Sequence, residues 1–364
     1  MFLRFILALD NFEIINSNHL IEYFPSIELN ILRFLSSKIQ PIQNYLHVHF
    51  LILSHLQSNM SFIVSKNHIE PLYIINNNPF KKYNITSTIT KYKDFVTHDF
   101  VDLNDLLEPL EGTLAYHRKN WEYMKIYSTL KKTNKLKPGC KGLVFGCGKE
   151  KMISLFANFG CSILATDAPN ADHWILTDQY ANEKNDLFYP ELISKDVFDK
   201  NVRFTHADMN NIDKYISNEK FDFIWSVCCF EHLGSLQKGI DFLIHSSKLL
   251  KPDGIAVHTT EFTFLNDPEM NFEYHDVCFY RADDILNAKK QLETNEFNIA
   301  PLDLERGKNY HDEIYARGKL PPGWIIPDFE PYDKMIYPYH GSIMVGDIPA
   351  TCFCIAICHQ GANI

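Results

Sequence analysis

From about residue 112 onward, the chain alternates between strand-like and helix-like patterns. Apolar runs typical of strands stand at 141–146, 161–166, 202–206, 221–227 and 254–260, with a last run at 350–358. Helix-like stretches stand at 114–136, about 149–159, 177–186, 210–217 and 236–250. Strands separated by helices of about ten residues or more predict parallel crossovers. The sequence therefore predicts a doubly wound α/β sheet, with its ligand site just beyond the carboxyl ends of the strands.

The first part of the chain lacks this alternation. Residues 1–110 mix short apolar runs with Asn-rich breaks and contain no motif. We interpret them as an N-terminal extension or small accessory domain, and residues 111–364 as the domain that holds the sheet. The extension would serve either dimerisation, which would make the protein a homodimer, or substrate binding. Residues 262–280 and 301–348 lack clear periodicity, and loops of this length are more often lids or binding loops than filler.

Charge and cysteine content narrow the choice of partner. The 364 residues include 35 Lys and Arg against 45 Asp and Glu, a net charge of -10, so nucleic acid is a poor candidate. The apolar opening, MFLRFILALDNFEII, is broken by charges and too short to span a bilayer, so we expect a cytoplasmic protein without a membrane span. The nine cysteines show no zinc-type spacing, so we expect reduced core thiols and no metal.

The strand at 141–146 runs directly into Gly146-Cys147-Gly148, before a helix-like stretch. Glycine lets a backbone approach a ligand closely, and free amides at a helix start favour anionic groups. Glycines also simply make tight turns, and for the turn taken alone this alternative has equal weight. The dinucleotide fingerprint has a further glycine where this chain has Lys151. The turn therefore argues against NAD without excluding it.

Two acids end the next two predicted strands. Asp167, followed by Ala168, stands about 20 residues after the glycines, where a carboxylate can accept hydrogen bonds from both ribose hydroxyls. Asp208 ends the strand after it, where it would bond an adenine amino group with Met209 against the ring. Either acid could instead be a helix cap. Two acids that end consecutive strands after a glycine turn are nevertheless a stronger signal than either alone.

The motifs that follow complete a recognisable series. The fourth strand lies in FDFIWSVCCFEHL, with Ser226 in it and Glu231-His232 beyond it, and LLKPDG and HTTEF come next. In order and spacing, residues 112–360 resemble a class I S-adenosylmethionine-dependent methyltransferase. The resemblance implies a Rossmann-like, mostly parallel sheet with an antiparallel last strand, and S-adenosyl-L-methionine as cofactor. It implies a cofactor site formed by Gly146, Cys147, Gly148, Glu150, Asp167, Ala168, Asp208, Met209, Ser226 and Arg118.

A closer resemblance is to a bacterial subgroup with stretches like HRKNWEY, KEKMISLFANFG, EHLGS and HTTEF. Its members often occur among polysaccharide and glycan-modification proteins, which implies a sugar or glycan-precursor hydroxyl as acceptor, by association only. The chain departs from the wider family in reading VFG where many members have an acid just before the first glycine. Glu150 or the backbone would then have to hold the methionine amino group.

A hydroxyl acceptor needs a base to take its proton. His232 is the first candidate, because histidine titrates near neutrality and this one follows the fourth strand directly. The alternative is that Glu231 and His232 brace the site or cap the next helix. His258 and Glu261 are the second candidates, with Glu261 expected to face the acceptor.

The helix-like stretch before the sheet carries Arg118 and Glu122 on one face, four residues apart. Arg118 would pair with the cofactor carboxylate and Trp121 would cover the site. The alternative, which we favour, is an ordinary ion pair and a core tryptophan.

Two other functions use the same sheet. An NAD-dependent oxidoreductase would share Asp167 but predicts neither Asp208 nor EHLGS. A non-catalytic cofactor-binding member of a glycan-assembly complex would bind the cofactor without releasing methyl groups to any acceptor.

Overall fold

The computed structural model describes residues 78–107, 118–169, 179–216, 219–267, 269–274, 277–307, 342–345 and 348–364. Most of the predicted extension, residues 1–77, lies outside these described residues. Among the described residues, no helix combines the length and the apolar character that crossing a membrane requires.

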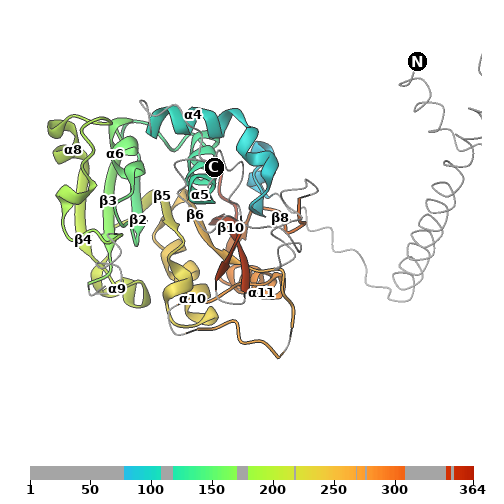
Figure 1. Cartoon of the computed structure of the whole chain (residues 1–364). Helices are drawn as coiled ribbons and strands as arrows, with labels where there is room; N and C mark the ends of the chain where they lie inside the picture. The colour runs from blue at the N-terminus through green and yellow to red at the C-terminus, as the bar shows by residue number, and fades with distance from the viewer. Residues whose placement is uncertain are drawn as a thin grey trace, which may run out of the picture. The chain divides into compact units, whose positions relative to one another are not determined.

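The fold is built on one mixed sheet (Figure 1). Its path runs in the order β4-β3-β2-β5-β6-β10-β1-β8, with β7 and β9 also paired to β10. The strands are β1 (Ser87–Ile89), β2 (Lys141–Phe145), β3 (Ser162–Asp167), β4 (Val202–His206), β5 (Phe221–Val227), β6 (Leu250–Phe262), β7 (Phe297–Ile299), β8 (Leu302–Asp303), β9 (Ser342–Val345) and β10 (Ile348–His359). Neighbours from β4 to β6 pair in parallel, whereas β10 pairs with β6 antiparallel. The predicted fold class, with its antiparallel last strand, is confirmed.

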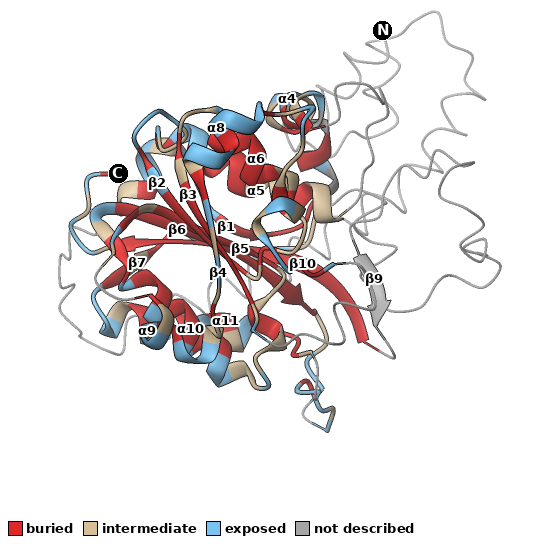
Figure 2. Cartoon of the chain, turned by 90° about the vertical axis from the view of Figure 1, so that its left-hand side faces the viewer, coloured by how far each residue is buried: buried red, intermediate tan, exposed pale blue. Residues whose placement is uncertain are grey.

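Helices cover both faces of the sheet (Figure 2). One face carries α4 (His98–Leu107), α5 (Arg118–Lys132), α6 (Lys151–Asn158) and α8 (Lys195–Asn201). The other carries α9 (Ile212–Tyr215), α10 (Leu236–Ser247) and α11 (Ala282–Thr294). Short 3-10 helices are η1 (Pro79–Tyr83), η2 (Tyr92–Val96), η3 (Lys184–Leu187), η4 (Met209–Asn211) and η5 (Phe230–His232). Each face has its own apolar core, with Trp121, Phe156 and Trp225 in one and Phe242 and Phe353 in the other.

The segment just before residue 110 belongs to this fold. Strand β1 pairs with β10 in the sheet, with Thr88 opposite Cys354. Helix α4 packs beside α5, where the Ser128 hydroxyl donates a 2.9 Å hydrogen bond to Asp99. Residues 78–107 therefore share the core of the sheet domain.

Alternation of apolar residues predicted the strands well. The predicted strands at 202–206 and 221–227 coincide with β4 and β5. The predicted helix at 177–186 is wrong over its described part, which holds only η3. The prediction omitted α11, although it carries a helical signal: Ile285, Ala288 and Leu292 are buried with helical spacing.

Candidate active site

The sheet has a topological switch point at β2, which lies between β3 and β5. The connection from β2 to β3 runs through α6 on one face, and that from β5 to β6 runs through α10 on the other. In open α/β sheets, ligands bind in the crevice that forms at the carboxyl ends of strands where the order reverses. Gly146-Cys147-Gly148 follows β2 at this point.

Both glycines of this turn are required by the backbone. Gly146 and Gly148 have φ angles of +55° and +47°, in the left-handed region that other residues rarely adopt. A Cβ atom on Gly146 would lie 2.6 Å from Cys229 Sγ, and one on Gly148 would lie 2.5 Å from the Gln179 carbonyl oxygen. Cys147 between them is buried, and its amide donates to the Thr166 carbonyl at 3.0 Å.

Asp167 joins three segments around the turn. Its Oδ2 accepts hydrogen bonds from the amides of Gly148 at 3.0 Å and Ala181 at 3.1 Å, and its Oδ1 accepts from Ala168 at 2.8 Å. The Tyr180 hydroxyl donates to the Ala168 carbonyl at 2.8 Å. Burial raises the pKa of Asp167, against the effect of these amides. No pattern in the sequence predicted these contacts of residues 179–181.

Asp208 and Met209 lie beside the turn. Asp208, half-buried, caps η4 by accepting from the Asn210 amide at 2.8 Å, and it also bonds the Asn211 side chain at 2.7 Å. Its role as a helix cap, one of the two sequence interpretations, is therefore present in the structure. Met209 Sδ lies 3.8 Å from the position of a Cβ on Gly146, so β4 and β2 bring these residues to one place.

Glu150 opens α6 as a buried carboxyl group. It is the N-cap residue, and its Oε2 accepts from Trp225 Nε1 at 3.3 Å. Burial raises its pKa to about 8, although Lys119 opposes the shift. A carboxyl in this state is poised to ionise when a cation binds beside it.

A buried charged cluster links α5 to the end of β6. Arg118 pairs with Glu261, and Lys119 Nζ lies 3.3 Å from Glu122 Oε1. The other oxygen of Glu122 accepts from Cys228 Sγ at 2.8 Å and from the Thr259 hydroxyl. Although burial opposes its ionisation, Lys119 and Arg118 lower the pKa of Glu122. Sequence reasoning missed Lys119 and Thr259, and it placed Arg118 with the cofactor or Glu122 rather than with Glu261.

Trp121, which would have covered the site in one sequence interpretation, lies in the core. It is fully buried and donates from Nε1 to Asp94 at 2.8 Å. The favoured alternative of a core tryptophan holds.

Cys228 follows β5 in a strained conformation. Its φ of +46° is in the left-handed region, which is unusual for a residue other than glycine and is often found at functional sites. Its amide is held by Thr259, through the carbonyl at 3.1 Å and the hydroxyl at 3.2 Å. These bonds fix the Cys228 side chain beside Glu122.

Glu231 lies beside one of the predicted catalytic residues, His232, and near another, Glu261. Glu231 is fully buried, accepts from the Thr260 hydroxyl at 3.0 Å, and has its pKa raised to about 7 by burial. His232 Nε2 lies 3.9 Å from Glu231 Oε1, and its side chain is partly exposed. Single ligand atoms of Cys228, Glu231 and Glu261 lie within 4.8 Å of one another.

His258 lies apart from this group. Residues 258 and 261 point to opposite faces of β6, and His258 packs against the rings of Phe230 and Phe242. Its Nδ1 shares a 2.8 Å hydrogen bond with the buried Ser226 hydroxyl, and burial lowers its pKa to about 3. The structure thus joins His258 to Ser226 rather than to Glu261.

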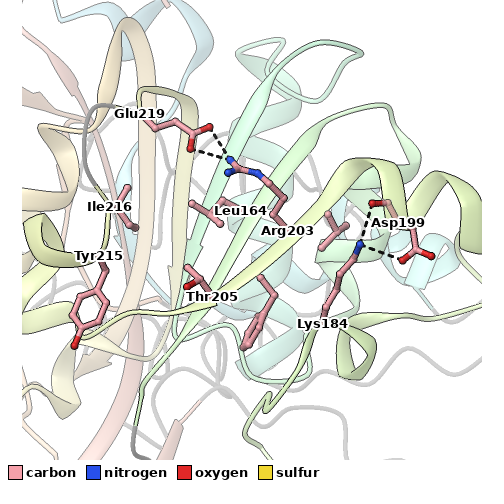
Figure 3. Close-up of a pocket in the computed structure, with 10 residues that line it drawn as sticks. Leu164, Lys184, Asp199, Arg203, Thr205, Tyr215, Ile216 and Glu219 are labelled. Atoms are coloured by element: carbon pink, nitrogen blue, oxygen red, sulfur yellow. Dashed lines mark hydrogen bonds and ion pairs between the residues drawn. The ribbon is translucent and has the colours of Figure 1, made fainter.

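A cavity of about 540 Å³ lies over β4 (Figure 3). Its charged groups pair with each other: Arg203 donates to Glu219 at 2.8 and 2.9 Å, and Lys184 donates to the Asp199 carbonyl at 3.0 Å. None of the predicted site residues lines it. The residues predicted to bind the cofactor lie instead mostly at the carboxyl ends of β2, β3, β4 and β5.

The doubly wound sheet, with a glycine turn and an acid at its switch point, defines a Rossmann-like nucleoside-cofactor protein. A family model described as a methyltransferase domain matches residues 116–297, half of the chain. The chain belongs to this family: it is a methyltransferase, the class of enzyme for which the sequence resemblance implies S-adenosylmethionine as cofactor.

No curated protein matches the chain. Solved structures do match, at low identity. One is an S-adenosylmethionine-dependent methyltransferase from Clostridium acetobutylicum, with 13% identity over 72% of this chain and 98% of that chain, at a TM-score of 0.38. Another is phosphoethanolamine N-methyltransferase 2 from Haemonchus contortus in complex with S-adenosyl-L-methionine, with 14% identity over 75% of this chain and 60% of that chain, at a TM-score of 0.38. Structural likenesses at this level assign no function to the chain.

The residues at the switch point fit this cofactor. Gly146 and Gly148 give the turn its positive φ angles and let it pack against Cys229 and Gln179, and Met209 offers an apolar surface beside Gly146. Asp167 Oδ1 accepts from one amide and can accept a further hydrogen bond, whereas Oδ2 already accepts from two. Glu150 supplies a buried carboxyl group at the start of α6, which would suit a cofactor that carries an ammonium group.

Proposed function

We propose that the protein transfers a methyl group from S-adenosylmethionine to a hydroxyl of a small-molecule or glycan acceptor, with a surface-polysaccharide sugar as the favoured class. The observation that carries the proposal is the group formed by Glu231 and His232 beyond the end of β5 and by Glu261 near the end of β6. Carboxyl and imidazole groups together suit a hydroxyl, which must be bound through hydrogen bonds and must lose a proton. The glycan part rests on the sequence resemblance alone.

In this proposal the cofactor lies along the carboxyl ends of β2 to β5. The backbone of Gly146, Cys147 and Gly148 lines it, and Asp167 with Ala168 binds the ribose. Asp208 meets the adenine amino group, with Met209 against the ring. Because a guanidinium has five N–H donors, Arg118 can bond the methionine carboxylate while it remains paired with Glu261.

Glu150 takes the role of the acid missing before Gly146 and bonds the methionine ammonium. Ser226 and His258, which bond each other, support the β5–β6 floor of the site. We give them no contact with the reacting atoms.

S-adenosylmethionine supplies an electrophilic methyl group on a sulfonium. The protein's task is to align the acceptor with that methyl group and to remove the hydroxyl proton. His232 is the proposed base, and the resulting imidazolium is stabilised by Glu231, whose Oε1 lies 3.9 Å from Nε2. Glu261, held by Arg118, accepts a hydrogen bond from the acceptor.

The test is release of S-adenosylhomocysteine from the full chain with matched acceptors. Monosaccharides and nucleotide sugars are compared with their amino-sugar counterparts. We expect turnover on hydroxyl acceptors, and loss of turnover without loss of cofactor binding in His232→Ala. The exposed His245 on α10 provides the matched control, His245→Ala.

Two results would contradict the proposal. Methyl transfer to amines but not to hydroxyls would change the acceptor class. Cofactor binding without release of S-adenosylhomocysteine with any acceptor would favour the alternative that the protein is a non-catalytic member of a glycan-assembly complex. Membership in the methyltransferase family removes the NAD-dependent oxidoreductase from consideration.

A further inference from the structure

Three side chains from separate elements converge at the acceptor side of the site. Cys228 follows β5, Glu231 lies in η5 and Glu261 lies near the end of β6. One ligand atom from each, a sulfur and two carboxylate oxygens, lies within 4.8 Å of the other two. Donor atoms around a single ion stand at such separations, because bonds of about 2.0–2.3 Å radiate from a shared centre.

Two of these groups have oxygen atoms that lack a partner. Glu231 is 0% exposed and Glu261 is 5% exposed. Within the part of the chain that the structure describes, neither Glu231 Oε1 nor Glu261 Oε2 has a hydrogen-bond partner. His232 Nε2 lies 3.9 Å from Glu231 Oε1, beyond hydrogen-bond distance. Buried carboxylate oxygens are normally satisfied by donors or by metal ions, so these two point to a ligand.

The net charge of the cluster can be balanced by a divalent cation. Arg118 neutralises Glu261, and Lys119 neutralises Glu122. The Glu231 carboxylate and a Cys228 thiolate would then remain, with a combined charge of -2. A divalent ion balances this charge without disturbing either ion pair.

We propose that Cys228, Glu231 and Glu261 bind one zinc-class divalent transition-metal ion. A thiolate ligand favours such an ion over Mg²⁺. Three protein ligands with an open position are the usual pattern of a catalytic zinc site. Binding requires loss of the Cys228 thiol proton, which passes to solvent.

A second set, Glu122 with Cys228 and Cys352, also has ligand atoms within 4.8 Å of one another. Lys119 lies 3.3 Å from one Glu122 oxygen, while the Thr259 hydroxyl bonds the other and remains when Cys228 loses its proton. Both oxygens of Glu122 therefore already have partners of their own. We assign the ion to the Glu231 and Glu261 side.

The role of the ion rests on the proposed hydroxyl methylation. An acceptor oxygen placed at the open position loses its proton more readily, because the cation stabilises the alkoxide. His232, beside Glu231, receives that proton. The acceptor oxygen then forms its bond to the methyl carbon as the methyl–sulfur bond breaks, and S-adenosylhomocysteine leaves as a neutral thioether.

The test measures metal binding apart from catalysis. The full chain is stripped with a chelator and dialysed against zinc, manganese or magnesium chloride, and its metal content is determined by mass spectrometry. We expect one zinc per chain and no retained magnesium. Cobalt in place of zinc should give a thiolate-to-metal charge-transfer band that Cys228→Ser removes.

Substitutions of the proposed metal-binding residues test where the ion binds. Glu231→Gln and Glu261→Gln should each weaken zinc binding at least tenfold, as judged by competition with a chelating dye. Cys358→Ser, in a buried thiol paired with Ile255 toward the far end of β10, should change nothing. Stabilisation by S-adenosylhomocysteine in thermal melts shows which variants keep their fold.

Distinct results overturn the proposal. One is wild-type protein that binds S-adenosylhomocysteine but takes up neither zinc nor cobalt. The other is zinc binding lost in Glu122→Gln and Cys352→Ser but kept in Glu231→Gln and Glu261→Gln. Zinc binding in a chain that methylates no hydroxyl would leave the metal site standing and refute the proposed function instead.

Discussion

The buried carboxyl of Glu150 makes a quantitative prediction about cofactor affinity. Its pKa of about 8 means that it is largely protonated at pH 6 in the free protein. A methionine ammonium beside it favours the ionised form, so binding should expel a proton and affinity should rise with pH. If the carboxyl is fully ionised in the complex, the affinity rises about tenfold from pH 6 to 7 and about fivefold from pH 7 to 8.

The variant Glu150→Gln keeps an oxygen for Trp225 but has no charge to titrate. At pH 8 it should bind roughly 10–100-fold more weakly, since a hydrogen bond between charged groups is worth about 1.5–3 kcal/mol. At pH 6 the two proteins should be nearly equal, because wild-type Glu150 is then mostly neutral. The difference in affinity between wild type and Glu150→Gln should increase with pH.

Titration calorimetry with S-adenosylhomocysteine measures this directly. That ligand keeps the amino group but lacks the sulfonium charge, so the effect of the ammonium is isolated. Buffers of different ionisation enthalpy give the number of protons released. The ligand amino group itself titrates near pH 8, and comparison with Glu150→Gln removes that contribution.

A control carboxylate, away from the turn, is available just before β5. Glu219 pairs with Arg203, and Glu219→Gln should leave the pH dependence unchanged. Equal proton release in wild type and Glu150→Gln would refute the assignment of Glu150 to the ammonium. So would equal affinity at pH 8.

Three further predictions concern the turn and the base. Asp167→Ala should weaken S-adenosylhomocysteine binding at least about 100-fold in calorimetry, since a ribose hydrogen bond to a carboxylate is lost together with the amide bonds that shape the site; binding within tenfold of wild type would contradict the ribose role. Gly148→Ala should lower the free energy of unfolding in urea by roughly 1–3 kcal/mol, because a positive φ and the Gln179 carbonyl both oppose a Cβ; an unchanged midpoint would mean that the turn differs from the one described. His232→Ala should keep cofactor affinity and lose about 100-fold or more in kcat on the true acceptor, whereas full activity would exclude His232 as the base.

The sequence predicted those parts of the fold that rest on local pattern. Strands β4 and β5 have their predicted bounds because alternating or continuous apolar residues mark a strand within a few residues. Gly146, Gly148 and Asp167 were identified because a turn with positive φ and an acid at a strand end leave a short, ordered signal.

The charged cluster could not be predicted in the same way. Arg118 and Glu122 stand four apart on a helix, which usually indicates an exposed ion pair. Here that face of α5 is buried against the sheet, and Glu122 meets Thr259, 137 residues away in sequence. Arg118 meets Glu261, 143 residues away. Which residues become partners depends on how α5 packs on β6, and no local sequence pattern contains that information.

The position of β10 has a consequence for synthesis of the chain. Strand β10 begins 86 residues after β6 ends (262 to 348), yet it lies between β6 and β1 in the sheet. At typical translation rates, roughly 4–17 s pass before the ribosome completes those intervening residues. Until then the edge of β6 is an open row of amides and carbonyls that can pair with another chain. Crowded expression should therefore favour aggregation of nascent chains, and slower initiation or a chaperone that shields β6 should increase the yield of folded protein.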